Sequence, residues 1–448
     1  MSALSAGHET KARGTAAPVR GGPPCWRWAL AGSVLMTACF DQSVGPLFES
    51  DGRLSVTNDE SALDPRMTFP DTPVPIDPDG SPAAAGPAAV SDPVGGPALA
   101  PSSITLTLIA EVAPPTVGGL PVQATAVWAT SNDRAIVSYN RQGATTVGAL
   151  DWFTSLRNGR PSLRSSLQFA TSDVSAVFTD GSWAFAATAT SDLSFAAPAV
   201  LERIRIRSDR FQLDPGNMRL QLTSFAGTSA AASDNEIYAT SGNGGHVFAY
   251  DQSTMALRGQ YALADARWVA FDDPGNRVVV LQGTPGRLAV FQEGSFPGGS
   301  MTLLNTIPFP GADVPESKSA MEIAGGKAYV AAGTAGVQVI CLSTGAIIAT
   351  VPRPDPVALG LDPSVVVTNA VTVDNDLMFI SNGEAGVYAA AGSRDFDNTS
   401  CGPMTITVLG RLRFNNLQSV NHVVYKGGNL FIAAGTGGTK VVDVNVQN

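Results

Sequence analysis

The sequence predicts an all-β protein: a seven-bladed β-propeller of four-stranded blades, its last blade closed by the N-terminal strand, preceded by a disordered linker. Three observations lead to this prediction. A unit of short strands and tight turns recurs along residues 102–448. One turn motif counts seven copies of that unit, and a second turn motif counts six, with a seventh copy located by alignment. A strand-like run, Ile104–Val112, supplies the strand that the last unit lacks. Repeats of roughly 40–50 residues with four strands each are typical of propellers.

The clearest copy of the unit is residues 418–448. It consists of three apolar, β-branched runs of strand length with glycine-rich turns between them. The runs are Val420–Tyr425, Leu430–Ala434 and Lys440–Val444, and the turns are Gly427-Gly428 and Gly435 to Gly438. A piece this small cannot bury both of its faces, so we expect it to pack against further copies of itself.

Two turn motifs locate the other copies. The second turn of the unit begins with glycine or asparagine and has glycine at its fourth position, because these residues accept a left-handed backbone. It begins at Asn140, Gly242, Gly283, Gly333, Gly383 and Gly435, with steps of 41, 50, 50 and 52 residues from Gly242 onwards. A seventh copy, Val177–Ala187, aligns with Val424–Ala434 but has lost these glycines. The first turn, rich in Asp, Asn and Gly, independently counts seven.

The ends of the repeat region predict circular closure. Most copies carry a fourth strand, but the last copy has only three. Ile104–Val112 resembles Met404–Leu412, the fourth strand of the sixth copy. We therefore expect this N-terminal strand to complete the last blade, which leaves no sheet edge open.

Two segments carry a family resemblance. Ala328–Ile340 and Asn429–Val444 resemble LVIVD repeats, which form propellers in bacterial and archaeal surface proteins. The match is good in the last three blades and weak in the first two. The resemblance implies a seven-bladed propeller lipoprotein of the bacterial cell surface. It carries no catalytic residue across, since the motif is structural.

Residues 1–38 are expected to be a lipoprotein signal peptide. Arg20 and Arg27 precede a short apolar run, Trp28–Thr37, that is too short to span a bilayer. The run leads into Thr37-Ala38-Cys39, which resembles a bacterial lipobox and predicts lipidation of Cys39. The protein would then be exported and anchored by lipid to a membrane of the bacterial envelope, either the outer membrane or the cell surface. A chance cysteine after an apolar run is the alternative.

The segment 39–101 is expected to be a disordered tether, and 102–448 the propeller. Pro, Ala and Gly dominate the tether, which lacks the apolar content needed to offset the entropy of ordering. The net charge of −10 argues against nucleic acid as a partner, and against an anionic membrane surface as an electrostatic one.

The residues that could carry catalysis predict neither a bound metal nor a cofactor. The three histidines are scattered, and His422 is expected to line the channel without forming a ring of ligands. No zinc-protease, paired CxxC, nucleophile-elbow or calcium-loop motif occurs in the sequence. The aligned channel-mouth positions carry no carboxylate; they are Val174, Thr228, Arg267, Ser319, Asn369 and Asn421. These features favour a non-catalytic protein-binding or scaffolding module. The alternative is a hydrolase or lyase, lactonase-like, with a site held by loops.

Two cysteines remain after removal of the leader and lipidation of Cys39. Cys341 ends a third strand, and Cys401 lies in a loop on the same face of the neighbouring blade. One hypothesis is a disulfide between these two cysteines, since export permits disulfide formation. Two free thiols are the other, because adjacent blades can hold such loops too far apart for a bond.

Two proline-rich connections are the candidate partner site. They are Phe309–Lys318 and Pro352–Ser364, expected on the same face of adjacent blades. Apolar and acidic side chains alternate there, an arrangement typical of protein-binding patches. The candidate residues are Phe309, Asp313, Glu316, Asp355, Leu359 and Asp362. The alternative is that Phe309 and Leu359 fold back onto the blades. We expect a monomer whose partner is an envelope protein or a surface polymer.

Overall fold

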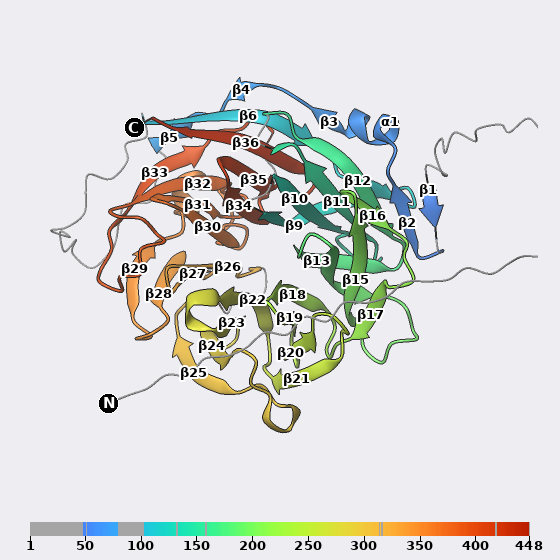
Figure 1. Cartoon of the computed structure of the whole chain (residues 1–448). Helices are drawn as coiled ribbons and strands as arrows, with labels where there is room; N and C mark the ends of the chain where they lie inside the picture. Colours follow the sequence, from blue (N-terminus) through green and yellow to red (C-terminus); the bar gives the residue numbers. More distant parts are fainter. Residues whose placement is uncertain are drawn as a thin grey trace, which may run out of the picture. The chain divides into compact units, whose positions relative to one another are not determined.

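Seven antiparallel sheets stand in a ring around a common axis (Figure 1). This computed structural model describes residues 48–50, 52–78, 103–130, 133–156, 159–312, 314, 317–416 and 419–447, with the backbone alone for 48–50. Each sheet is one blade, whose strands follow one another from the axis to the rim. The predicted seven-bladed β-propeller is therefore confirmed for these residues.

The strand bounds follow the predicted units. The strands of blades 1 and 2 are β9 (Gln123–Thr130), β10 (Arg134–Asn140), β11 (Gly148–Thr154), β12 (Ser162–Phe169), β13 (Ser172–Thr179), β14 (Trp183–Thr190), β15 (Ala199–Arg207), β16 (Arg210–Gln212) and β17 (Met218–Gln221). Those of blades 3 and 4 are β18 (Gly227–Ala232), β19 (Glu236–Ser241), β20 (His246–Asp251), β21 (Leu257–Ala262), β22 (Ala266–Asp272), β23 (Arg277–Gln282), β24 (Arg287–Gln292) and β25 (Leu303–Pro308).

Blades 5 to 7 are the most regular. Their strands are β26 (Met321–Ala324), β27 (Lys327–Ala331), β28 (Val337–Cys341), β29 (Ile347–Val351), β30 (Ala370–Asp374), β31 (Leu377–Ser381), β32 (Val387–Gly392), β33 (Ile406–Leu412), β34 (His422–Lys426), β35 (Asn429–Ala433) and β36 (Thr439–Val446). A short hairpin of β7 (Thr116–Val117) and β8 (Leu120–Pro121) precedes β9.

The ring is closed as predicted. Strand β6 (Ile104–Val112) pairs antiparallel with β36, from Thr439↔Val112 to Val446↔Ile104. Leu106 and Leu108 join the core between blades 6 and 7. The two ends of the repeat region thus share one sheet, and blade 7 gains its fourth strand from the N-terminal side.

Glycine ends the second turn of a blade because the neighbouring backbone lies too close for a side chain. Gly438 has φ +74°, and a Cβ there would lie 2.1 Å from the carbonyl oxygen of Val112 in β6. Gly336 repeats this geometry in blade 5, where a Cβ would lie 2.0 Å from the carbonyl oxygen of Val351. The glycine that recurs in the repeat is therefore required both by the turn and by the close packing of the neighbouring backbone.

The variant Gly438→Ala is expected to lower the free energy of unfolding by roughly 3 kcal/mol or more, since it combines left-handed strain with a backbone clash. Gly244→Ala is the matched control, because Gly244 has φ +70° but nothing within 4 Å of a Cβ. The control should cost about 1 kcal/mol. Denaturant unfolding measures both, and equal losses would contradict the close-approach argument.

The predicted disordered tether contains an ordered segment, residues 52–78, which we call the strap. Its elements are β2 (Leu54–Thr57), α1 (Glu60–Leu63), η1 (Asp64–Arg66), β3 (Met67–Thr68), β4 (Thr72–Pro73) and β5 (Ile76–Asp77), preceded by β1 (Phe48–Ser50). The strap runs along the rim, where β2 pairs with β12 of blade 1, β3 and β4 with β6 of blade 7, and β5 with β33 of blade 6 (Figure 1). The expectation of disorder is wrong for this part of 39–101.

Buried apolar side chains and ion pairs explain why the strap docks. Leu54, Val56 and Leu63 are each at most 2% exposed. Arg66 forms an ion pair with Asp151 of β11, and Arg53 lies 2.7 Å from Glu202 of β15. The registers of β11 and β15 place the two carboxylates at equivalent positions of blades 1 and 2, and both are fully buried. The strap thereby supplies the cations that these buried acids require.

Among the described residues, no helix combines the length and the apolar character needed to cross a membrane. The predicted signal peptide, Cys39 and residues 79–101 of the tether lie outside the described residues.

Candidate functional site

The candidate partner patch is only partly surface. Phe309 is 6% exposed and packs in the core between blades 4 and 5, with its backbone N–H donating to the carbonyl of Gly286. Phe309 is therefore not an exposed apolar tip, and the alternative that it folds back onto the blade is confirmed, because the second turn of blade 4 holds this backbone against the blade. Asp313 and Glu316 lie outside the described residues.

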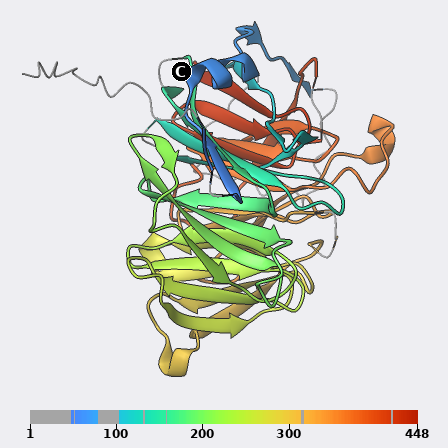
Figure 2. The ribbon, with the colours of Figure 1, turned by 90° about the vertical axis from the view of Figure 1, so that its right-hand side faces the viewer.

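The connection 352–366, which we call the α2 loop, projects from the same face. It carries the short helix α2 (Pro356–Leu359), seen in orange at the right of Figure 2. Asp355 caps this helix by accepting from the N–H of Val357 at 2.9 Å, and Asp362 accepts from the N–H of Ser364 at 2.8 Å. Asp355 and Asp362 are exposed, Leu359 is half-buried and Val357 is 81% exposed.

Arg353 holds the base of the α2 loop in place. Its Nη1 donates to the carbonyl oxygens of Pro363 at 3.0 Å and Val366 at 2.6 Å. With the caps at Asp355 and Asp362, these bonds fix the loop conformation before any partner arrives. The loop therefore presents Val357 on an ordered support.

The channel-mouth side chains hold neighbouring blades together. Asn369 Nδ2 donates to the carbonyl of Val420 at 3.1 Å, and Asn421 Nδ2 donates to that of Ala124 at 2.8 Å. Thr228 does the same toward Ala266 of blade 4 at 2.7 Å. Arg267 donates to carbonyl oxygens that include those of Ala312 and Val314. These polar residues serve the architecture of the ring.

Side chains from opposite blades meet on the axis. The rings of Trp268 in blade 4 and His422 in blade 7 stack with centroids 5.1 Å apart. Lys318, which leads into blade 5, donates its Nζ to the carbonyl of Ser175 in blade 2 at 3.3 Å. Burial, and then the charge of Lys318, lower the pKa of His422 to about 3. His422 is thus neutral at physiological pH, and the axis holds packed side chains.

Burial also lowers the pKa of Lys318, to about 8 from 10.5. Between these two values the unfolded chain keeps a proton that the folded protein has released, so stability should rise with pH from about 8 to about 10.5. We expect Lys318→Met to abolish this rise and to stabilise the protein at pH 7 by about 1–3 kcal/mol. Urea unfolding at a series of pH values measures it, with the exposed Lys426→Met as control; an unchanged slope in Lys318→Met would contradict the assignment.

A charged groove lies on the opposite face, between the outer parts of blades 2, 3 and 4. Its volume is about 790 Å³. Trp183, Arg203 and Arg205 line the end formed by blade 2. The other end is lined by Glu236, Arg258 and Glu293 among others. We call this the blade 2–4 groove. The candidate residues predicted from the sequence lie on the other face, and this groove was not predicted.

Arg203 is the unusual residue of this groove. The strand registers align it with buried apolar residues in the third strands of the other six blades: Trp152, Ala249, Val290, Val339, Ala389 and Val441. Arg203 is 7% exposed, and its Nη2 donates to the carbonyl of Gly216 at 2.9 Å. Its Nε has no hydrogen-bond partner among the described residues. The other six blades use this position for apolar packing. An arginine there indicates a function, and alignment of the repeats reveals it.

Trp183 orients two guanidinium groups. Arg203 lies 4.3 Å and Arg205 4.7 Å from the centroid of its ring, as cation–π contacts require. Burial lowers the pKa of Arg203 from its ordinary value, opposed by the charge of Asp180. Two like charges therefore contact one aromatic ring.

A pair of carboxyl groups lies at the other end of the groove. Burial, and then a hydrogen bond to Glu293 and the charge of Glu293, raise the pKa of Glu236. Arg258 Nη1 lies 3.3 Å from both Glu236 Oε1 and Asp251 Oδ2. Within the described residues, no group of three or more His, Cys, Asp or Glu side chains is arranged to hold a metal ion.

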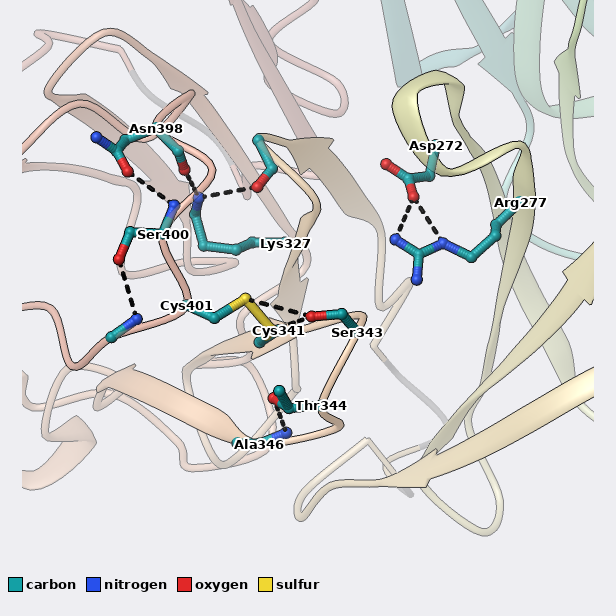
Figure 3. Close-up of a disulfide and its surroundings, with 12 residues drawn as sticks. Asp272, Arg277, Lys327, Cys341, Ser343, Thr344, Ala346, Asn398, Ser400 and Cys401 are labelled. Atoms are coloured by element: carbon teal, nitrogen blue, oxygen red, sulfur yellow. Dashed lines mark hydrogen bonds and ion pairs between the residues drawn. A yellow bond between two sulfur atoms is a disulfide. The ribbon is translucent and has the colours of Figure 1, made fainter.

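The structure joins Cys341 and Cys401 by a disulfide, with their Cα atoms 5.6 Å apart (Figure 3). Cys341 ends β28, and Cys401 belongs to the connection between β32 and β33. Blades 5 and 6 are therefore linked covalently. Lys327 Nζ, beside this bond, donates to carbonyl oxygens of Gly325 and Asn398, which ties the same two blades together.

The chain has been compared with known families and structures. No protein-family model matches the sequence, and a search of curated proteins finds no match. The fold is similar to a chain in a crystal structure of the mitotic checkpoint complex, with TM-score 0.51 and 10% identity, covering 82% of this chain and 100% of that one. A crystal structure of the computationally designed Ika8 protein has TM-score 0.43 and 13% identity, covering 76% and 93%. At these identities the likeness concerns the fold alone.

The ring of seven sheets makes this protein a seven-bladed β-propeller. Propellers present loops on a rigid ring, so this architecture is compatible with a protein-binding module.

Proposed function

We propose that the protein is an exported, lipid-anchored propeller of the bacterial cell envelope that binds a protein partner and has no catalytic role. The resemblance of blades 5 and 7 to LVIVD repeats and the lipobox-like residues before Cys39 support export and anchoring. The packed axis supports a binding role, because Trp268 and His422 occupy the channel.

The α2 loop is the observation that carries the binding proposal. It combines an apolar tip, Val357, with acidic residues at its edges, Asp355 and Asp362. An apolar centre with a charged rim is typical of protein interfaces. Because Arg353 and the two capping aspartates already order the loop, little conformational entropy would be lost on docking.

Site-specific photo-crosslinking tests this surface. A photoreactive amino acid at Val357 is expected to capture one discrete partner in intact cells that express the full chain. The same residue at Leu304, which is 49% exposed on the rim of blade 4, is the control and should capture nothing discrete. Identical products from the two positions, or none from Val357, would refute this binding surface.

Lipidation is tested separately. In a bacterial host that lipidates exported proteins, an alkyne-tagged fatty acid should label the wild-type protein and leave Cys39→Ser unlabelled. The labelled protein should sediment with membranes, and Cys39→Ser should be released. An unlabelled wild-type protein refutes the anchor and leaves the binding surface untouched.

The strap changes the geometry expected of the anchor. Residues 40–47 separate Cys39 from β1, which pairs with β2 of the strap. Fully extended, this segment spans at most about 30 Å. A lipidated protein would therefore be held near its membrane by the rim of blade 1, where β2 pairs with β12.

A further inference from the structure

A polar pocket lies between blades 6, 7 and 1, on the face that carries the α2 loop. Its volume is about 520 Å³. Six of its seven lining residues have polar side chains, and the seventh is Gly435. The six are Gln123, Gln142, Glu384, Ser419, Asn421 and Thr436. We call this the blade 6–1 pocket; among the described residues that line it, Glu384 alone is charged.

The lining keeps oxygen acceptors that the protein itself does not use. Asn421 Nδ2 donates to the carbonyl of Ala124 at 2.8 Å, which orients the amide and leaves Oδ1 without a donor among the described residues. Gln123 Nε2 likewise donates to Asn140 Oδ1 at 3.1 Å, and its own Oε1 accepts nothing from the described chain. A Cβ at Gly435 would lie 3.7 Å from Asn421 Nδ2 and 4.0 Å from Gln123 Oε1, so both amides flank one spot in the lining.

Glu384 joins this pocket to the α2 loop. Its backbone N–H donates to the carbonyl of Val365 in that loop at 3.0 Å, and a Cβ at Gly383 would lie 2.3 Å from the same oxygen. The side chain of Glu384 is exposed. Arg411 Nη2 donates to the main-chain carbonyl of Glu384 at 3.5 Å, whereas no described residue forms a hydrogen bond or an ion pair with the carboxylate. The pocket and the α2 loop are therefore adjacent parts of one surface, with an unpaired negative charge between them.

We propose that the blade 6–1 pocket receives an arginine side chain from a basic polypeptide segment that docks on the α2 loop. This inference deepens the proposed function and rests on it, since it names the chemistry of the protein partner. A guanidinium group has five N–H donors, and a carboxylate accepts two of them in parallel. Glu384 supplies the carboxylate, and the amide oxygens of Gln123 and Asn421 are acceptors for the remaining donors. The exposed Asp355 and Asp362 of the α2 loop add negative charge beside the pocket.

Anions and sugars fit this pocket less well than a cation does. None of the described lining residues is cationic, so a phosphate or a carboxylate would meet Glu384 without a counter-charge. The lining also contains no aromatic side chain on which the apolar face of a sugar ring could stack. A cationic side chain finds both a charge and acceptors that are open to it, because Glu384, Gln142 and Thr436 are all exposed.

Three variants test the pocket without disturbing the fold. Glu384→Gln keeps the shape of an exposed side chain and removes its charge, so the melting temperature should not change. Gln142→Ala shortens an exposed side chain on the blade 1 wall and leaves the net charge unchanged. Asp273→Asn is the matched control, because it removes one exposed negative charge from the turn between β22 and β23, on the opposite face.

The test measures binding of a fluorescent peptide of alternating Arg and Gly to the full chain by anisotropy. The wild type should bind, with affinity falling as salt rises. Glu384→Gln should weaken binding at least about tenfold, because it removes a charge-assisted hydrogen bond, and Gln142→Ala about threefold. Asp273→Asn should weaken it less than about twofold, since the opposite face contributes only through screened, long-range charge.

Several outcomes would overturn the proposal. Equal losses in Glu384→Gln and Asp273→Asn, an unaffected Gln142→Ala, or no binding by the wild type would each do so. Full competition by free arginine at the concentration of the peptide, or binding of maltotriose in place of the peptide, would assign the pocket to a small amine or to a sugar instead. If crosslinking at Val357 succeeds while peptide binding fails, only this inference falls. If the peptide binds the pocket and Val357 captures nothing, the α2-loop surface is refuted.

Discussion

Replacing the strap arginine at position 66, in the variant Arg66→Ala, is expected to lower the free energy of unfolding by about 3–5 kcal/mol. The change leaves the carboxylate of Asp151 fully buried without its cation. It also removes hydrogen bonds from Arg66 to the carbonyl of Ala113 and to Ser166. Denaturant unfolding followed by circular dichroism measures the loss.

Two comparison variants separate this effect from a general weakening of the strap. Arg164→Ala breaks a strap ion pair with Glu60, which is 53% exposed, and should cost no more than about 1 kcal/mol. The double variant Arg66→Met/Asp151→Leu replaces the buried pair with apolar groups and should recover most of the lost stability. If Arg66→Ala loses no more free energy of unfolding than Arg164→Ala does, the buried carboxylate of Asp151 does not depend on Arg66, and the prediction is wrong.

The number of blades and their closure could be predicted because both depend on local sequence. Tight turns require particular residues, and their spacing survives in the chain as a visible period. Gly438 illustrates this, since one residue satisfies the turn and the approach of β6. The pairing of β6 with β36 could be predicted because the last copy lacks a fourth strand and Ile104–Val112 resembles the fourth strand of the sixth copy.

The strap could not be recognised from composition, because its own strands are short. β3, β4 and β5 contain two residues each, and the surrounding segment is rich in proline. The blades nevertheless contain residues that indicate a missing partner. Asp151 and Glu202 fall on equivalent inward positions of third strands, and a buried acid demands a cation from somewhere.

The candidate site was predicted least well, because loops carry no repeat. The sequence left Phe309 open between an exposed patch and burial against the blade. The turn of blade 4 fixes its backbone, and its ring fills the core between blades 4 and 5. Arg203 was not predicted, because the register of its strand decides whether its side chain is buried between blades. Aligning the third strands by register would have shown one arginine among apolar residues.

Deletion of residues 104–112, which removes β6, is expected to abolish the cooperative unfolding transition or to lower the melting temperature by more than 15 °C, an order-of-magnitude estimate for the loss of many buried groups. Leu106, Leu108 and Val112 leave the core, and the ladder to β36 disappears. The strap loses its partner at the same time, because β3 and β4 both pair with β6. Removal of a segment of equal length within 79–101 is the control and should change the melting temperature by only a few degrees, since loop length has a small entropic effect.

The ladder between β6 and β36 also predicts how the deletion variant behaves. Strand β36 becomes an exposed edge with unpaired backbone groups, which is a site for aggregation. A synthetic peptide of residues 103–113 should pair with that edge and raise the melting temperature in a concentration-dependent way. Equal melting temperatures for the two deletions, or no response to the peptide, would contradict the view that this strand closes the ring, since an open ring would then be as stable as a closed one.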